Sequence, residues 1–343
     1  MKNSSSKIKK KQRENSLDLL RVLSMFMIIV IHSQTFGIFH YGSPTGFNLF
    51  VLYLIRALFI VASNCYVIIS GYFLILKAYK RKKVAFFIFE VSMYSVFIYL
   101  CLVIFGAIPF SISELIHSCF ILFYGNYWFA SLYLVLYLLS PFLTIFLRQL
   151  SKKKFQQLLF VTLLIFSFWA TFSGLPILGM NEGYSIGTFV LLYFIGAYIQ
   201  LYDFPVSWTK GWYLFHYINI SIGIALYLFL VGYDDWLLYY HSPLILLSSV
   251  FLFLFFKNSQ IRVQGLSKIV PFIFGVYLIH ENTFVRTLLW EKWIPVQDYL
   301  THPLVNSLFL GLSVIIFVIC LIISACVYGV IKKFFYFILI SLG

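Results

Sequence analysis

The stretch that decides the fold lies near the N-terminus, where residues 17–39 read LDLLRVLSMFMIIVIHSQTFGIF. It holds one aspartate, one arginine and one histidine among mostly apolar side chains. A run of about twenty such residues is what a helix needs to cross the hydrocarbon core of a bilayer. The basic stretch before it resembles the start of a signal peptide, but no small-residue cleavage site follows. We therefore expect a retained first transmembrane helix.

The rest of the chain has the same apolar character. Of its 343 residues, 62% are hydrophobic and 10% are charged, and the mean hydropathy is +0.95. A soluble protein carries about 25% charged residues, so this chain has too little polar surface to cover itself in water. A β-barrel would need alternating segments of about ten residues, which are shorter than the apolar runs here. The sequence predicts an all-α, polytopic transmembrane bundle of about ten helices.

Ten apolar segments are expected to cross the membrane, and one short segment is not. The short segment, 112–124, carries Glu114 and His117, and we expect it to be an interfacial or re-entrant piece of an outer loop. The ten predicted transmembrane segments are 17–39, 47–76, 84–108, 127–147, 155–176, 185–201, 211–233, 237–256, 268–288 and 303–331.

The distribution of basic residues predicts the orientation. With the N-terminus in the cytoplasm, about twenty of the 25 lysines and arginines fall in cytoplasmic stretches, as the positive-inside rule requires. We therefore expect a multi-pass protein of a bacterial plasma membrane, with both termini cytoplasmic. Its parts would be a basic N-terminal tail (1–16), a transmembrane domain (17–331) and a C-terminal tail (332–343). The net charge of +14 reflects this topology, not a nucleic-acid partner.

The five cysteines give no sign of a metal centre or a disulfide framework. They form no Cys-x-x-Cys pair and lie in mostly apolar stretches, as buried small side chains do. The sequence predicts no bound metal.

Ionisable side chains inside membrane helices are costly and are therefore candidates for function. In the first helix, Arg21 and His32 are eleven residues apart, which is almost three helical turns, so both lie on one face about 16 Å apart along the axis. Asp18 lies three residues before Arg21 and can pair with it. Taken singly, Arg21 could be a membrane anchor and His32 a packing residue.

More polar residues are predicted in the outer half of the bundle. His280 and Glu281 lie about 18 Å along the ninth segment, at a depth comparable to that of His32. The second segment carries Arg56, and the fourth begins at the outer face with Asn126-Tyr127-Trp128-Phe129. The topology therefore predicts a polar cluster near the outer surface.

These features together resemble the integral-membrane acyltransferase-3 family over nearly the whole chain. The strongest element is Leu17-Asp18-Leu19-Leu20-Arg21, followed after ten intervening residues by His32. Further similarity lies in Ile69-Ser70-Gly71-Tyr72, in Tyr127-Trp128-Phe129 with Tyr133, Tyr137 and Pro141, in Tyr193-Phe194-Ile195-Gly196-Ala197-Tyr198, and in Tyr277-Leu278-Ile279-His280.

The resemblance implies an enzyme that transfers an acyl group, most often acetyl, from cytoplasmic acyl-CoA to a hydroxyl of a surface or capsular polysaccharide. Acyl-CoA would be a substrate, with no permanently bound cofactor. His32 would be the general base, while Arg21 would organise the donor path and pair with Asp18. Arg56 or Asn126 would stabilise the oxyanion, and Trp128 would stack against the sugar. His280 and Glu281 would orient His32, contact the sugar or hold helices together.

The donor-binding residues depart from the family pattern. Many relatives have two arginines separated by one residue at the start of the third helix. Here Lys80-Arg81-Lys82-Lys83 keeps the positive charge without the paired guanidinium groups. We expect these four residues, with Lys152, Lys153 and Lys154, to attract the phosphates of acyl-CoA.

A different class of protein, a transporter of polysaccharide or lipid-linked sugar, would also use about ten helices with interior charges. An internal repeat would favour transport, and the sequence contains none that we can identify.

Overall fold

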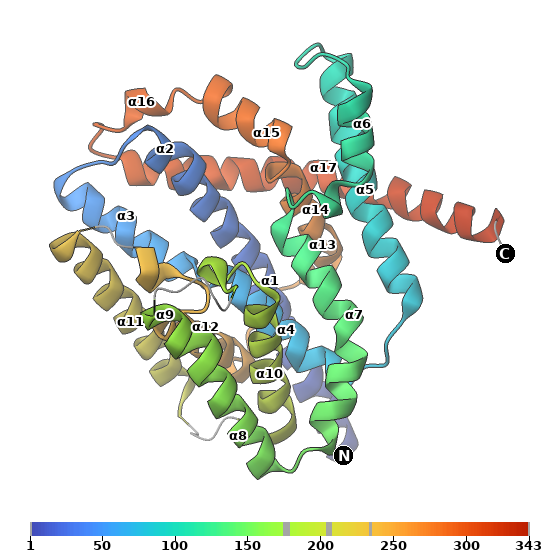
Figure 1. Ribbon diagram of the computed structural model, residues 1–343, viewed down its shortest axis with the longest axis vertical. Coiled ribbons are helices and arrows are strands. Elements are labelled where there is room, and N and C mark those ends of the chain that lie inside the picture. Colours follow the sequence, from blue (N-terminus) through green and yellow to red (C-terminus); the bar gives the residue numbers. More distant parts are fainter. Residues whose placement is uncertain (1, 174–178, 204–207, 233–234, 342–343) are drawn as a thin grey trace. The chain divides into compact units, whose positions relative to one another are not determined.

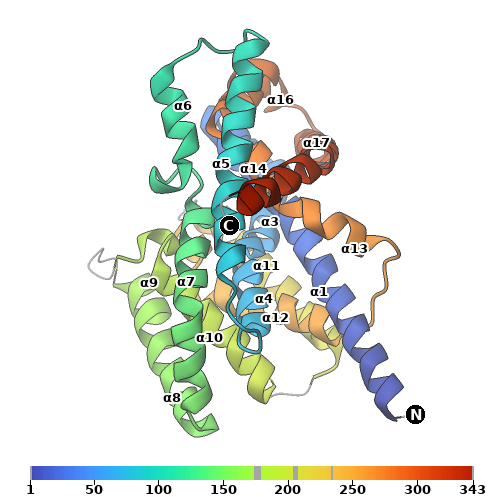
Figure 2. The ribbon, with the colours of Figure 1, turned by 90° about the vertical axis from the view of Figure 1, so that its right-hand side faces the viewer.

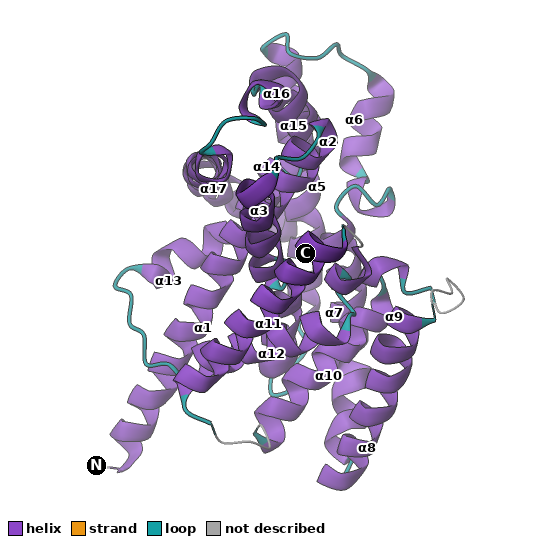
Figure 3. Ribbon diagram, turned by 90° about the vertical axis from the view of Figure 1, so that its left-hand side faces the viewer, coloured by secondary structure: helices purple, strands orange, loops and turns teal. Residues whose placement is uncertain are grey.

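The computed structural model of the chain describes residues 2–173, 179–203, 208–232 and 235–341, and every element in these ranges is helical (Figures 1 and 3). This confirms the predicted fold class. Within these ranges, 8 helical stretches are long and apolar enough to cross a membrane, with helices that follow closely on one another counted as one stretch. Two shorter apolar helices, Ile186–Tyr202 and Leu266–His280, correspond to the two remaining predicted segments.

The chain forms two compact units that are interleaved along the sequence. The first comprises residues 1–31, 44–79 and 135–270, and the second comprises residues 32–43, 80–134 and 271–343. Two helices, α1 (Lys2–His32) and α7 (Trp128–Gln149), each begin in one unit and end in the other.

The first unit is organised around α4 (Ala62–Leu74) and α10 (Ile186–Tyr202), which pack closely against each other (Figure 1). At Gly71 and Gly196 an added Cβ would clash with the backbone of the facing helix. Such small residues let membrane helices approach closely. The other helices of this unit are α3 (Gly46–Phe59), α8 (Lys152–Leu163), α9 (Ala170–Phe172), α11 (Lys210–Val231), α12 (Pro243–Asn258) and α13 (Leu266–Ile269).

In the second unit, α14 (Ile273–His280) packs against α5 (Arg81–Ile104) and α17 (Val305–Ser341). Gly275 makes this packing possible, because an added Cβ would meet the side chains of Tyr94 and Ser324. Figure 2 shows α6 (Ile112–Cys119) beside α5. The unit also contains a π-helical turn (Ser33–Ile38), α2 (Phe39–Tyr41), α15 (Thr283–Thr287), a second π-helical turn (Leu288–Trp293) and α16 (Val296–Tyr299).

Some element boundaries differ from the predicted segments. The predicted segment 47–76 is two helices, α3 and α4, and the predicted segment 268–288 is divided among α13, α14 and α15. Pro271 and Asn282 stand at the two breaks of the latter. Proline lacks the N–H that an uninterrupted helix uses, and Asn282 caps α15. Both expected tails are helical where described, since α1 begins at Lys2 and α17 ends at Ser341.

Candidate active site

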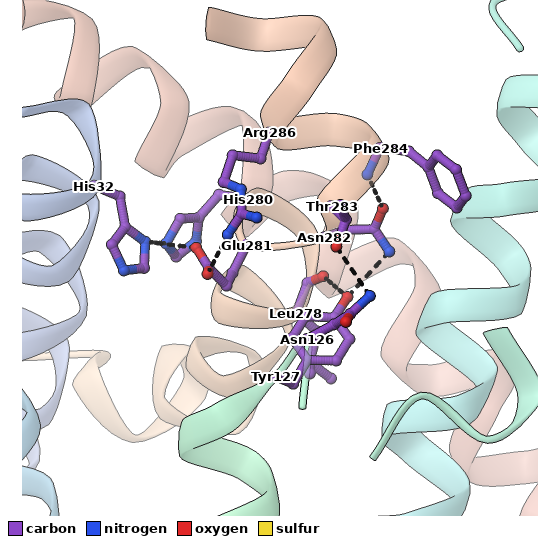
Figure 4. A network of polar contacts seen from close by, with 10 residues as sticks. All are labelled: His32, Asn126, Tyr127, Leu278, His280, Glu281, Asn282, Thr283, Phe284 and Arg286. Carbon is purple, nitrogen blue, oxygen red and sulfur yellow. Dashed lines mark hydrogen bonds and ion pairs between the residues drawn. The ribbon is translucent and has the colours of Figure 1, made fainter. Parts of the chain in front are cut away.

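Three side chains of the second unit meet where two helices end. His32 is the last residue of α1 and precedes the π-helical turn, His280 is the last residue of α14, and Glu281 follows it directly. Glu281 is 3% exposed and His280 is 4% exposed. Figure 4 shows the imidazole of His32 facing the other two side chains.

The hydrogen bonds of the two imidazoles determine which ring nitrogens carry hydrogen. Nδ1 of His280 lies 2.7 Å from the carbonyl oxygen of Val276. A carbonyl can only accept, so this nitrogen carries the hydrogen, and Nε2 of neutral His280 is an acceptor. Nδ1 of His32 lies 3.1 Å from that Nε2 and therefore donates to it. In neutral His32 the unprotonated nitrogen is then Nε2, which points away from this contact (Figure 4).

The carboxylate of Glu281 lies between a histidine and an arginine. Its Oε2 is 2.9 Å from Nδ1 of His32, and its Oε1 accepts a hydrogen bond of 2.9 Å from Nη1 of Arg286. The guanidinium of Arg286 also lies over the ring of Phe36, 4.2 Å from its centroid. A buried carboxylate is costly without such partners, so Arg286 keeps a negative charge stable beside His32.

A second polar network holds the start of α7 to the break between α14 and α15 (Figure 4). The hydroxyl of Tyr127 donates to the carbonyl of Leu278 at 2.6 Å and accepts from the side-chain amide of Asn282 at 3.1 Å. The side-chain oxygen of Asn282 accepts from the backbone N–H of Phe284, which caps α15. This network fixes the backbone on both sides of Glu281.

Asn126 and Trp128, both predicted at the outer face, belong to the same unit. The side-chain amide of Asn126 donates to Oγ1 of Thr283 at 3.2 Å. Trp128 is the first residue of α7, and its ring packs edge-on against Phe129. Asn126 is therefore attached to the segment that follows Glu281.

The predicted donor-side pair lies in the first unit. Arg21 forms an ion pair with Asp18, as expected. Its guanidinium lies over the ring of Phe73, 5.2 Å from the centroid. The backbone carbonyl of Arg21 accepts a hydrogen bond of 2.6 Å from the hydroxyl of Tyr66.

Arg56 also belongs to the first unit, where it lines a small pocket together with Glu182, Tyr184 and Tyr240. Burial raises the pKa of the Tyr184 hydroxyl, and the neighbouring Tyr240 adds to the shift, so Tyr184 is uncharged at neutral pH. Arg56 is thus placed in a different unit from His32, His280 and Glu281.

The four predicted donor-binding residues, Lys80 to Lys83, stand at the start of α5. Lys80 precedes the helix, and Arg81, Lys82 and Lys83 form its first turn. They are exposed.

Arg286 and Asn282 were not identified from the sequence. Arg286 is five residues after Glu281, which on an unbroken helix would place the two side chains on different faces. They meet because the helix is interrupted at Asn282. The one sequence feature that could have indicated this interruption is Asn282 itself, because asparagine commonly occupies the N-cap position of a helix.

The same cluster is where a metal ion could bind. Ligand atoms of His32, His280 and Glu281 all lie within 4.8 Å of one another. Two histidines and a carboxylate suit a divalent metal. However, Arg286 already places a positive charge on this carboxylate, at 2.9 Å. A metal at these atoms would also replace the hydrogen bond between the two imidazoles.

The fold and the cluster define a multi-pass membrane protein with a buried histidine–carboxylate site. The family model described as an acyltransferase domain, Acyl_transf_3, matches residues 14–329. The chain therefore belongs to the acyltransferase-3 family and is a membrane acyltransferase. No curated protein and no solved structure matches the chain.

Proposed function

We propose that this chain is a transmembrane O-acyltransferase. It takes an acyl group, most simply acetyl, from acyl-CoA on the cytoplasmic side. It transfers that group to a hydroxyl of a surface or capsular polysaccharide on the outer side of the plasma membrane. The family supports acyl transfer. The abundance of lysine and arginine in the predicted cytoplasmic stretches supports the sidedness.

The observation that carries the proposal is the direction of the hydrogen bonds at His32. The carbonyl of Val276 fixes the hydrogen of His280, and His280 in turn fixes the hydrogen of His32. The free lone pair of His32 is thereby placed on Nε2. A general base needs such a lone pair within hydrogen-bond reach of the hydroxyl that it deprotonates.

In the proposed reaction, Nε2 of His32 takes the proton of the acceptor hydroxyl as its oxygen attacks the thioester carbonyl. A C–O bond forms, the C–S bond breaks, and the imidazolium returns its proton to the departing thiolate of CoA. The carboxylate of Glu281, 2.9 Å from Nδ1, stabilises the transient positive charge on the ring. Arg286 holds that carboxylate in place.

Asn126 is the proposed oxyanion donor. Its side-chain amide has two N–H groups, and one of them donates to Thr283. The other can donate to the carbonyl oxygen as negative charge develops on it. Trp128 begins the adjoining helix and offers an aromatic face to a sugar ring.

The test is NMR of surface polysaccharide from a strain that lacks the gene, complemented with wild type or with His32→Ala. The proposal expects acyl signals to disappear on deletion, to return with wild type and to stay absent with His32→Ala. Loss of the polysaccharide itself from the surface would instead indicate a transporter. Full acylation with membrane-inserted His32→Ala would exclude the proposed base.

A further inference from the structure

A pocket of about 200 Å³ lies in the first unit, between the end of α4 with the residues after it and the second half of α7. Its polar lining includes Lys77, Tyr79, Ser140, Thr144 and Arg148. Complete small-molecule sites typically measure ~300–1,000 Å³. This pocket is therefore sized for one polar group of a larger ligand.

The charge of this pocket is positive. Lys77 and Arg148 line it, and none of its lining residues is an aspartate or glutamate. The ammonium of Lys77 also lies over the ring of Phe73, 4.9 Å from its centroid. Arg21 lies over the same ring. The pocket is thus adjacent to the residue that the sequence assigns to the donor path.

Two acidic residues of the same unit form ion pairs with basic residues that do not line the pocket. Asp18 pairs with Arg21, and Asp203 pairs with Lys257. Arg148 has no carboxylate partner in the part of the chain that the structure describes. Within the described residues, no carboxylate therefore competes with an anionic ligand for the guanidinium of Arg148.

Of the serine and threonine hydroxyl groups that α7 contributes to the lining, that of Thr144 can donate to a phosphate oxygen, whereas that of Ser140 is already engaged. Pro141 lies within α7 and has no N–H to donate to the carbonyl of Tyr137. The hydroxyl of Ser140 donates to that carbonyl instead, at 2.7 Å. Oγ1 of Thr144 lies 2.7 Å from the hydroxyl of Tyr193. When Tyr193 donates in this pair, Thr144 retains its own hydrogen for a ligand.

We propose that this pocket binds the diphosphate group of the acyl-CoA donor, with Arg148 and Lys77 as its cationic ligands. The inference rests on the proposed use of acyl-CoA. An arginine fork suits phosphate oxygens in pairs, and a lysine adds a mobile point charge. The nucleoside lies outside the pocket, whose volume is too small for it.

The experiment measures binding and turnover by the full-length protein in nanodiscs of neutral lipid, with a parallel series in nanodiscs that contain anionic lipid. The variants are Arg148→Gln, Arg148→Lys and Lys77→Ala, with Lys210→Ala as the control. Lys210 is an exposed lysine at the start of α11 and does not line the pocket. The probes are CoA for binding, and acetyl-CoA and acetyl-pantetheine for turnover. Acetyl-pantetheine has the same thioester but no diphosphate.

Arg148→Gln is expected to weaken CoA binding and to raise KM for acetyl-CoA by about tenfold or more, because a hydrogen bond to a charged group is lost. Its kcat/KM for acetyl-pantetheine should equal that of wild type. Arg148→Lys should lie between Arg148→Gln and wild type, and Lys210→Ala should change neither value. Equal thermal stability of the variants will show that they are folded.

Unchanged CoA affinity in both Arg148→Gln and Lys77→Ala would overturn the inference. An effect of the variants on CoA binding that appears only in anionic-lipid nanodiscs would also overturn the inference, since the pocket would then hold a lipid headgroup. If CoA binds through Arg148 and no acyl transfer occurs with any acceptor, the diphosphate site stands and the proposed function fails.

Discussion

The position of the hydrogen on Nδ1 of His32 follows from a chain of two hydrogen bonds that begins at a backbone carbonyl. The carbonyl of Val276 is an obligatory acceptor, and the two hydrogen bonds that follow from it measure 2.7 Å and 3.1 Å. We therefore expect His280 to be a positioning residue, which affects the rate through His32 without touching the reacting atoms. Glu281 adds a charge at the same nitrogen.

His32→Ala is expected to lower kcat by about 10²–10⁴-fold, the usual contribution of a positioned base. Protein level and membrane insertion should be unchanged. The measurement is acyl transfer from radiolabelled acetyl-CoA to glycan in membranes. His40→Ala is the matched control, because His40 is an exposed histidine nearby in the chain. A packing role for His32 would instead appear as loss of protein.

Glu281→Gln is expected to lower kcat on the order of tenfold or more while leaving KM for both substrates nearly unchanged. The variant keeps the size of the side chain but removes the charge beside the imidazolium, a charge-assisted contact. Steady-state kinetics on purified protein measures this effect. Glu291→Gln, at an exposed acid of the same unit, should behave as wild type. A change confined to KM would contradict a role in stabilising the imidazolium.

Chelation is expected to leave activity unchanged, because the cation at Glu281 is the guanidinium of Arg286. The measurement is turnover after dialysis against EDTA, with and without added Zn²⁺, together with metal analysis of the purified protein. Activity that is lost on dialysis and restored by zinc would mean that His32, His280 and Glu281 hold a metal.

Much of this site could be anticipated from residue types and depth. Counting along two helices placed His32 and His280 at comparable depths, and the structure brings them into contact. The ion pair of Asp18 with Arg21 followed from their spacing. Arg286 could not be anticipated, since its contact with Glu281 depends on a change of chain direction. The catalytic roles themselves stay predictions.

At the scale of elements, the close contact of α4 and α10 depends on two glycines. Gly71 faces the backbone of Tyr193, and Gly196 faces the backbone of Ile68. Both lie in motifs that carried the family resemblance. Their physical role here is to permit close packing of two helices.

Gly196→Ala is expected to destabilise the protein by about 1–3 kcal/mol, the usual cost of an overpacked core. The facing atom is a backbone oxygen, which cannot rotate away. The measurement is the thermal unfolding midpoint in detergent. Gly223→Ala in α11 is the control: apart from the backbone of its own helix and its chain neighbours, nothing lies within 4 Å of an added Cβ, and alanine favours helix. An unfolding midpoint for Gly196→Ala equal to that of the control would refute the packing role.

Segment boundaries were the least predictable part of the fold. Hydropathy reports that a stretch is apolar enough to span, and it does not distinguish a continuous helix from one interrupted inside the protein. The interruption near Ile60 lies in the apolar run 57–62, which contains no proline or glycine to mark it. The break at Asn282 had a cap residue, and the one at Pro271 had a proline.

At the scale of the whole molecule, charge is distributed very unevenly along the chain. The predicted outer loops carry six acids, of which Asp234 lies outside the described residues: Glu114, Glu182, Asp234, Asp235, Glu291 and Asp298. The predicted cytoplasmic stretches carry most of the lysines and arginines. The two interleaved units could not be foreseen, because each unit is assembled from three separate stretches of the chain.

This asymmetry leads us to expect that the donor is used from the cytoplasmic face only and that the product appears outside. A CoA thioester carries several negative charges, so the basic face attracts it and the acidic face repels it. The test supplies acetyl-CoA to each face in turn, in vesicles of known orientation that contain glycan on the outer-face side. Transfer should occur only with cytoplasmic donor, and it should weaken as salt screens the attraction. Equal activity from both faces would contradict the sidedness, because a donor that enters freely from the acidic face cannot depend on this charge distribution.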